Sequence, residues 1–99
     1  MNPTALTPKQ KSFLRSRAHS LKPVVLIGAA GLSKAVAREI EQAIAHHELI
    51  KIRLGGTDRA ARQQLSDDIC ELTGAAAVQT IGRMLVVYRP GKHPRLALP

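Results

Sequence analysis

Aromatic residues, cysteine and long apolar runs are all scarce in this sequence, and each scarcity excludes a kind of protein. Phe13 and Tyr88 are the only aromatic residues, so the chain cannot build the aromatic platform on which RNA-recognition motifs and OB folds stack bases. Cys70 is the only cysteine, which excludes an internal disulfide and a cysteine metal centre. No apolar run approaches the roughly 20 residues of a membrane-spanning helix, and residues 1–20 lack the apolar core of a signal peptide. We therefore expect a cytoplasmic protein that does not enter a membrane.

Acidic residues are missing from both ends of the chain. Lys and Arg number 15 against 7 Asp and Glu, a formal net charge of +8, and all the acids lie between Glu39 and Glu71. Two basic ends around an acidic middle predict a surface for a polyanion, with nucleic acid as the first candidate. A positive charge that serves only solubility remains the alternative.

A first helix is predicted from Thr7 to Ser20. Thr7 and Gln10 have the spacing of a capping box, and Pro8 suits the first helical position. Apolar and basic residues fall on different sides of this helix. The expected inner side is Leu14, Ala18 and Leu21, and the expected basic face is Lys11, Arg15 and Lys22.

A strand, a glycine loop and a second helix are predicted next. The apolar run from Pro23 to Ile27 predicts a strand that is covered on both faces. Gly28-Ala29-Ala30-Gly31 follows it, and residues 32–47 are predicted to be helical. The expected inner side of this helix is Leu32, Val36, Ile40, Ala43, Ile44 and His47.

The remaining elements complete an α/β pattern. In the strand predicted over 49–54, Ile50, Ile52 and Leu54 alternate with Lys51 and Arg53, and Gly55-Gly56 ends it. The third helix is capped by Thr57 or Asp58 and ends at Gly74, with Ala61, Leu65, Ile69 and Leu72 as its inner stripe. Strands over 76–81 and 84–89 are joined by a tight turn at Gly82-Arg83.

The predicted order is therefore α-β-α-β-α-β-β. Right-handed crossovers followed by a hairpin give a four-stranded mixed sheet packed with helices. A chain of 99 residues has the size of a single domain. We expect its ordered core to span about residues 6–90, with a loose basic tail over 91–99.

The loop from Gly28 to Gly31 is the strongest candidate for a binding site. Its glycines let the backbone turn sharply and let a phosphate approach closely, and the following helix presents N–H groups and a positive dipole end. Lys34 and Arg38, one turn apart, add positive charge. KH domains clamp a nucleotide backbone with a GxxG loop. The alternative is that the glycines only form the turn, and neither a dinucleotide fingerprint nor a Walker A loop is present.

No group of residues has the pattern of a catalytic or metal site. His46 and His47 are adjacent on a helix, so their side chains point about 100° apart and are poorly placed to chelate one ion. The neighbouring acids Asp67 and Asp68 fail as a catalytic pair for the same reason, and Cys70 is predicted to be a small buried residue. We therefore expect no enzymatic activity, no cofactor and no metal.

A wider set of segments is more specific than the loop alone. It comprises Leu14-Arg15, Leu21-Lys22-Pro23-Val24-Val25-Leu26-Ile27-Gly28, Gly31-Leu32-Ser33, Glu39-Ile40, Ala43, His46-His47-Glu48-Leu49-Ile50-Lys51, Gln79-Thr80-Ile81-Gly82 and Leu85-Val86-Val87-Tyr88-Arg89. This combination, which runs from about Leu6 to Arg89, resembles the CRM domain family, named for chloroplast RNA splicing and ribosome maturation. Within that family it is most similar to the bacterial stand-alone YhbY-type proteins.

The resemblance implies a fold similar to the C-terminal domain of translation initiation factor 3. It also implies RNA binding and, for the bacterial members, association with precursors of the large ribosomal subunit. It makes Gly28 to Gly31 the RNA-contacting loop, extended by the basic residues of the first helix, and His47 to Lys51 a structural helix-to-strand junction. Family loops commonly carry a basic or polar residue between the glycines, whereas this loop has Ala29 and Ala30. Backbone N–H groups, Lys34 and Arg38 must then supply more of the contacts.

Three hypotheses follow. The leading one is a monomeric, non-catalytic RNA-binding protein that acts on ribosomal RNA precursors as a large-subunit assembly factor and takes no small-molecule substrate. The others are a protein-interaction module whose charge serves solubility, and an enzyme that acts on a phosphorylated ligand at the glycine loop. The predicted RNA-binding residues are Gly28, Ala29, Ala30, Gly31, Lys34, Arg38, Lys22, Lys11, Arg15 and Arg83.

Overall fold

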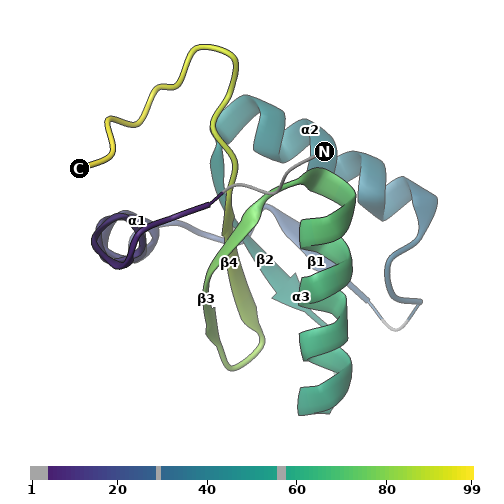
Figure 1. The fold of residues 1–99 in the computed structure, drawn as a ribbon. Helices are drawn as coiled ribbons and strands as arrows, with labels where there is room; N and C mark the ends of the chain where they lie inside the picture. The colour runs from purple at the N-terminus through teal and green to yellow at the C-terminus, as the bar shows by residue number, and fades with distance from the viewer. Residues whose placement is uncertain (1–4, 29, 56–57) are drawn as a thin grey trace.

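The helices and strands follow one another in the predicted order. The computed structural model describes residues 5–28, 30–55 and 58–99. Its elements are α1 (Pro8–Ala18), β1 (Val25–Ile27), α2 (Lys34–His47), β2 (Leu49–Leu54), α3 (Arg59–Thr73), β3 (Ala76–Ile81) and β4 (Met84–Tyr88) (Figure 1). The α-β-α-β-α-β-β order is thus confirmed.

The four strands form one mixed sheet in the order β1-β2-β4-β3. β1 pairs with β2 in parallel, and β4 runs antiparallel to both β2 and β3. β1, β2 and β3 therefore all end at the same edge of the sheet, which we call the carboxyl edge. The loop after Ile27, the start of the loop after Leu54 and the Gly82-Arg83 turn meet there, and the Leu54 N–H donates to the Arg83 carbonyl over 2.7 Å.

The sheet separates two helical layers. α2 and α3 pack on one face, while α1 lies alone on the other (Figure 1). On the first face Ile40, Ile44 and Ile69 are fully buried against the inward side chains of the strands. On the second face the buried side chains are Leu14, Ala18, Leu49, Val78, Val86 and Tyr88. The alternation of β2 positions its cations on this second face, because Ile50, Ile52 and Leu54 all point to the first.

Local sequence determines the helix ends as predicted. The Thr7 hydroxyl accepts from the Gln10 N–H over 3.1 Å and the Gln10 side chain accepts from the Thr7 N–H over 3.0 Å, so the capping box is confirmed. Asp58 caps α3 by accepting from the Ala61 N–H over 2.8 Å. Gly74 ends α3 with φ 74°, a left-handed conformation that glycine adopts without steric cost. Thr57 lies outside the described residues.

Three burial predictions are wrong. β1 is not covered on both faces: Leu26 is 64% exposed, because α1 packs over β2, β4 and β3 and leaves β1 open. His47, predicted on the inner side of α2, is exposed at the last helical residue. Leu72 is 56% exposed, since the face of α3 that meets the sheet passes through Ser66, Ile69 and Thr73 instead.

Residues 91–99 contain no helix or strand, but they are not the loose tail that the sequence predicts. The Glu48 carboxylate accepts hydrogen bonds from the Gly91 N–H over 2.6 Å and from the Arg95 N–H over 2.9 Å. Leu96 and Leu98 then pack against the apolar cluster under α1. The tail is held because a buried carboxylate and a small apolar contact lie along its path.

Candidate nucleic-acid interface

All seven acidic residues are confined to α2, α3 and their capping residues, and one of them, Glu48, binds the tail that packs on the α1 side of the sheet. α1 and the strands contain none. We call α1 and the sheet surface beside it the α1 face. Its cations are Lys9, Lys11, Arg15, Arg17, Lys22, Lys51 and Arg53.

The glycine loop lies at the carboxyl edge as an exposed tight turn. The Gly31 N–H donates to the Gly28 carbonyl over 3.0 Å, and Gly31 has φ 74°. Gly28 and Ala30 are exposed, while Ala29 lies outside the described residues. A Cβ added to Gly28 would meet no heavy atom within 4 Å, so space for a ligand exists directly above this residue.

The loop offers fewer unpaired N–H groups than its sequence predicts. The Ser33 N–H donates to the Gly31 carbonyl over 3.0 Å, and the Val36 N–H donates to the Ser33 hydroxyl over 3.2 Å. Within the first turn of α2 this leaves the N–H groups of Lys34 and Ala35 without a partner inside the helix. Side-chain cations must therefore supply most of the attraction for an anion at this loop.

All three helices have cations and no acids in the first turn, although the N-cap of α3 is Asp58. The first turns contain Lys9 and Lys11 in α1, Lys34 in α2, and Arg59 and Arg62 in α3. A cation at the positive end of the helix dipole is unfavourable by a few tenths of a kcal/mol or more. A nearby polyanion would remove this cost at α1 and α2, whereas at α3 the Asp58 carboxylate already offsets it.

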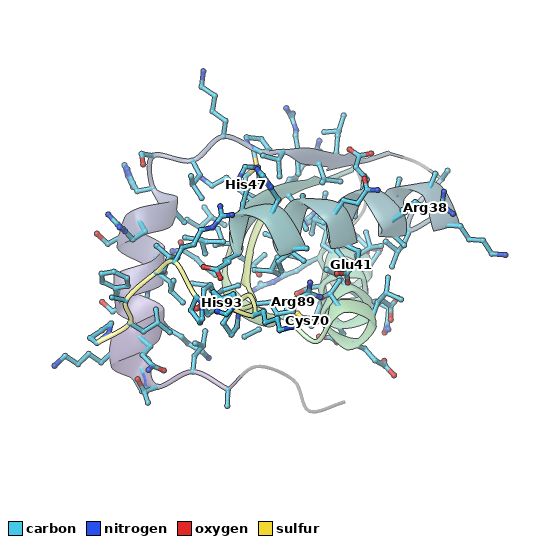
Figure 2. All side chains as sticks on the ribbon, turned by 90° about the horizontal axis from the view of Figure 1, so that it is seen from above. Arg38, Glu41, His47, Cys70, Arg89 and His93 are labelled. Carbon is cyan, nitrogen blue, oxygen red and sulfur yellow. The ribbon has the colours of Figure 1, made fainter. Side chains whose placement is uncertain are left out.

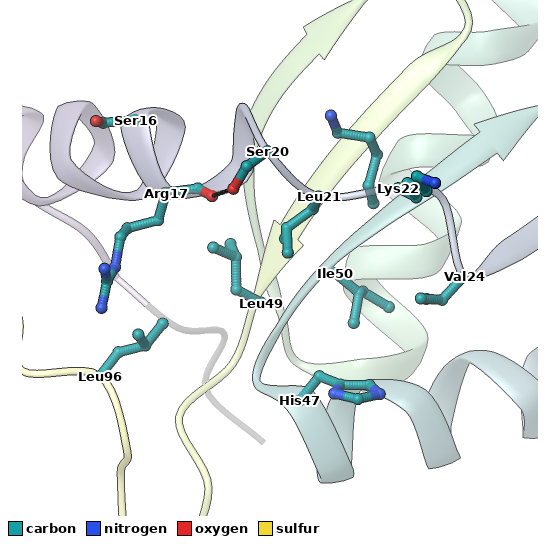
Figure 3. A pocket seen from close by; sticks show the side chains of 11 residues that line it. Ser16, Arg17, Ser20, Leu21, Lys22, Val24, His47, Leu49, Ile50 and Leu96 are labelled. Carbon is teal, nitrogen blue, oxygen red and sulfur yellow. Dashed lines mark hydrogen bonds between the residues drawn. The ribbon is translucent and has the colours of Figure 1, made fainter.

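Two open clefts lie on the α1 face and share Lys51. The first, of about 740 Å³, lies between α1, the end of α2 and the tail, and Arg17, Lys22 and Lys51 bring cations to it (Figure 3). The second, of about 670 Å³, lies beneath α1, where Arg15 and Lys51 border the sheet. Neither cleft is lined by an acidic side chain. We call them the tail cleft and the sheet cleft.

One row of side chains joins the sheet cleft to the carboxyl edge. Leu26 is paired with Arg53, Arg53 with Met84, and Met84 with Ile81, so the row crosses all four strands. Residues paired across neighbouring strands point to the same face, and Met84 and Ile81 line the sheet cleft. We call these four residues the cross-strand row.

The predicted site residues divide into groups. Gly28, Gly31 and the Arg83 backbone lie at the carboxyl edge, and Lys34 begins α2 three residues after Gly31. Arg15 lies in the sheet cleft and Lys22 in the tail cleft. Arg38 is exposed near the start of α2, at the end of the molecule remote from α1 (Figure 2). Lys11 is exposed on α1 but lines neither cleft. The predicted residues do not cluster at the loop: Lys11 and Arg15 belong to α1 on one side of the sheet, and Lys34 and Arg38 belong to α2 on the other.

Lys51 and Arg53 are the site residues that sequence reasoning did not single out. They belong to β2, a central strand whose other side chains are buried. Their alternation with Ile50 and Ile52 was the available signal, because cations repeated at every second position of an inner strand must share one face.

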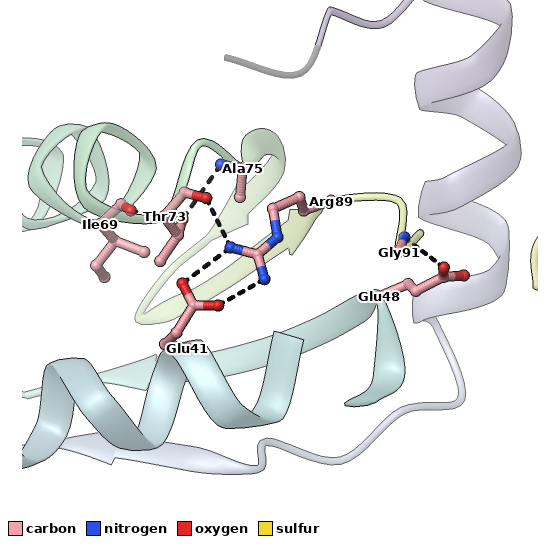
Figure 4. A network of polar contacts seen from close by, with 7 residues as sticks. All are labelled: Glu41, Glu48, Ile69, Thr73, Ala75, Arg89 and Gly91. Carbon is pink, nitrogen blue, oxygen red and sulfur yellow. Dashed lines mark hydrogen bonds and ion pairs between the residues drawn. The ribbon is translucent and has the colours of Figure 1, made fainter. Parts of the chain in front are cut away.

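Two C-terminal cations donate side-chain hydrogen bonds to groups of the chain itself. The Arg89 guanidinium donates to both Glu41 carboxylate oxygens, over 2.9 and 2.6 Å, and to the Thr73 carbonyl over 2.8 Å (Figure 4). The hydrogen bond between Arg89 and Glu41 raises the pKa of Arg89 and lowers the pKa of Glu41. Partial burial acts in the opposite direction on each group, but its effect is smaller. The Arg95 guanidinium donates to the His46 carbonyl over 3.0 Å.

The described residues contain no grouping suited to metal chemistry. No three metal-ligating side chains converge within residues 5–28, 30–55 and 58–99. Partial burial raises the pKa of Cys70, with a further contribution from the Asp67 charge, so its thiol is a weak nucleophile. Asp67 and Asp68 accept hydrogen bonds from Gln63 and Gln64 one turn earlier. In the part of the chain that the structure describes, every helix is too short or too polar to cross a membrane.

Comparison with known proteins identifies the family. Residues 6–89 match the CRS1 / YhbY (CRM) domain. A Haemophilus influenzae protein named as an RNA-binding protein is 49% identical over 96 residues, which cover 97% of each chain. A Pseudomonas aeruginosa protein named as a probable RNA-binding protein is 41% identical, over 91% of this chain and 86% of that one.

A solved structure has the same architecture. The solution structure of a Staphylococcus aureus protein, described as a putative RNA binding protein, superposes with a TM-score of 0.84 at 34% sequence identity. The match covers 96% of this chain and all of the other. The chain therefore belongs to the CRS1 / YhbY (CRM) domain family.

Proposed function

We propose that this protein binds RNA, and that the α1 face and the carboxyl edge together form the binding surface. The observation that carries the proposal is the confinement of all seven acids to α2, α3 and their caps. The cations of α1 and β2 therefore have no acidic residue in their own elements and attract a polyanion, whereas Lys34 and Arg38 share α2 with Glu39. Membership of a family whose relatives are named as RNA-binding proteins makes RNA the polyanion of choice.

The glycine loop acts at one end of this surface. Its backbone at Gly28 is open to solvent, and Lys34, Arg38 and Arg83 supply charge around it. α1 supplies the other end through Lys11, Arg15 and, after the helix, Lys22. Phosphate contacts of this kind position an RNA without reading its sequence.

The chain contributes no catalytic step in this proposal. It acts as a monomer on ribosomal RNA precursors, as an assembly factor for the large ribosomal subunit. The support is the resemblance of the chain to the bacterial YhbY-type members of its family. Crosslinking in cells followed by RNA sequencing tests this role. Enrichment of large-subunit ribosomal RNA is expected, and its absence beside another enriched RNA class would contradict the assignment.

Charge reversal at each end of the surface tests the proposal. We expect R15E/K22E and K34E/R38E each to weaken binding of RNA by roughly tenfold or more, because phosphate contacts are replaced by repulsion. The variants R15K/K22R and K34R/R38K preserve every charge and serve as matched controls. Fluorescence anisotropy with a labelled RNA measures the affinities, and circular dichroism verifies the fold. Unchanged affinity in both reversal variants would leave a protein-interaction module as the better interpretation.

A single methyl group tests the loop by itself. Gly28→Ala adds a Cβ into open space and requires no unusual φ, so the unfolding transition is expected to stay where it is. If the RNA backbone approaches Gly28 closely, this methyl group lowers the affinity by several-fold. A variant that folds and binds as the wild type does would remove the loop from the proposed surface.

A further inference from the structure

α1 covers only part of the sheet, and the part that it leaves open is apolar as well as basic. In the cross-strand row, Leu26 is 64% exposed and Ile81 is 61% exposed, with Arg53 and Met84 between them. The open face of a sheet is ordinarily polar, because apolar side chains stabilise a fold only when they are buried away from water. Two largely exposed aliphatic side chains in one row therefore indicate a surface that binds a partner.

The charge around the row indicates which partner. Arg53 lies within it, Arg15 and Lys51 border the adjoining sheet cleft, and no acidic side chain lines that cleft. A second copy of this chain would present the same positive face, and the two would repel each other. The partner must therefore combine negative charge with apolar surfaces. Single-stranded RNA does so, because its unpaired bases expose flat apolar faces beside the phosphates.

The dimensions of the row suit a short run of bases. Neighbouring strands lie about 4.8 Å apart, so four strands span roughly 14 Å. The four-stranded sheet of an RNA-recognition motif has the same width and stacks two or three bases on aromatic side chains. Here aliphatic side chains and the planar guanidinium of Arg53 take the place of aromatic rings, since arginine also stacks on base planes.

We infer that the cross-strand row of Leu26, Arg53, Met84 and Ile81 binds two or three unpaired bases of RNA, while Arg15 and Lys51 hold the phosphates beside them. The inference rests on the proposed RNA binding and adds a substrate class to it. RNA with an accessible single-stranded segment is bound across the row. Fully paired RNA reaches only the cations, because its bases are covered by stacking and pairing.

The test compares two RNAs and two kinds of variant on the full chain. A labelled single-stranded oligoribonucleotide of mixed sequence and a duplex of equal length are titrated by fluorescence anisotropy. We expect L26S/I81S to bind the single strand about tenfold more weakly, because the apolar contact area is lost, and to bind the duplex as the wild type does. Leu72→Ser is the matched control, since Leu72 is 56% exposed but belongs to α3 on the opposite side of the sheet.

A second variant keeps the charge constant. Arg53→Lys preserves the phosphate attraction but removes the planar group, so the single strand is expected to lose several-fold in affinity and the duplex none. If both L26S/I81S and R53K bind the single strand like the wild type, the inference is wrong while the proposed function stands. If the wild type binds neither RNA, the proposed function itself fails. Size-exclusion chromatography tests whether a second copy of the chain occupies the row instead of RNA. A wild-type dimer that L26S/I81S converts to monomer would overturn the inference.

Discussion

Glu48 shows how one residue can organise a segment far away in the sequence. It has φ 66°, a conformation that favours glycine and costs an ordinary residue about 1–3 kcal/mol. Its carboxylate is buried and accepts hydrogen bonds from the N–H groups of Gly91 and Arg95. Its own carbonyl accepts from the Arg89 N–H over 2.9 Å. The strained junction persists because the end of β4 and the tail are both bound to it.

The Glu48 carboxylate predicts a loss of stability in acid. Burial raises the pKa of this carboxyl, but backbone hydrogen bonds from Arg95, Gly91 and Leu96, together with the Arg95 charge, outweigh burial and lower the pKa below 4.5. A lowered pKa contributes stability above the unfolded-state value, and this contribution is lost as the pH falls through the folded-state value. We therefore expect Glu48→Gln to cost about 2 kcal/mol at neutral pH.

Urea unfolding at pH 7 and at pH 3 measures this effect. The difference in stability between wild type and Glu48→Gln is expected to shrink at the lower pH, because the unfolded carboxyl is protonated more readily than the folded one as the pH falls. Glu41, whose pKa is also lowered, leaves a residual pH dependence in the variant. An equal gap between the two proteins at both pH values would show that the charge on Glu48 contributes nothing.

Gly55 allows the chain after β2 to approach the end of β1 closely. A Cβ at this position would lie 2.4 Å from the Ile27 carbonyl oxygen and 3.2 Å from the Gly28 carbonyl carbon. Both atoms are backbone, so they cannot rotate away. We expect Gly55→Ala to destabilise the fold by about 1–3 kcal/mol and to displace the start of the glycine loop. Amide chemical shifts at Ile27, Gly28 and Gly31 report the displacement, and Gly28→Ala, which adds the same methyl group in open space, should leave stability unchanged.

At the scale of elements, Arg89 joins three of them. It follows the last residue of β4 and forms a bidentate ion pair with Glu41 on α2. It also donates a hydrogen bond to the carbonyl of Thr73, the last residue of α3. A cation at the C-terminus of a helix also suits the helix dipole. Because the Glu41 side chain is 48% exposed, solvent weakens the ion pair itself.

Arg89→Ala is therefore expected to cost about 2 kcal/mol, more than Glu41→Gln, which should cost less than about 1 kcal/mol. The difference arises because only the arginine variant also leaves the Thr73 carbonyl without this donor. A double-mutant cycle in urea isolates the pairwise energy of Glu41 with Arg89. Equal costs for the two single variants would mean that the bond to α3 has no energetic value.

Elements whose boundaries depend on local chemistry were predictable from sequence. The capping box of Thr7 and Gln10, the αL stop at Gly74 and the turn at Gly82 all agree with the structure. The exposure of β1 was not predictable, because it depends on where α1 crosses the sheet. A short apolar run has the same sequence pattern whether or not a distant helix covers it, so the pattern alone predicts a buried Leu26.

At the scale of the whole molecule, the charge distribution along the sequence predicted a basic surface but not its position. Both ends of the chain are basic, yet Arg89 and Arg95 from the C-terminal end donate hydrogen bonds to groups of the chain itself. The acidic middle of the sequence contributes Lys51 and Arg53 to the basic face, because β2 alternates across the sheet. Tertiary packing determines which cations face outward together. The distribution of charge along the sequence contains no information about this packing.

This separation of charge by the sheet leads to a prediction about salt. R15Q/K22Q lowers the formal net charge of +8 by two units, and D67N/E71Q raises it by the same amount. The Debye length is about 8 Å at physiological ionic strength, so the acids of α3 act weakly across the sheet. If the α1 face contacts the phosphates, the first variant should reduce the slope of log K against log salt by about 0.7 for each lost contact with a single strand. The second variant should leave both slope and affinity close to those of the wild type. If the two variants instead changed the affinity by equal amounts in opposite directions, the net charge of the protein, and not a particular face, would attract the RNA.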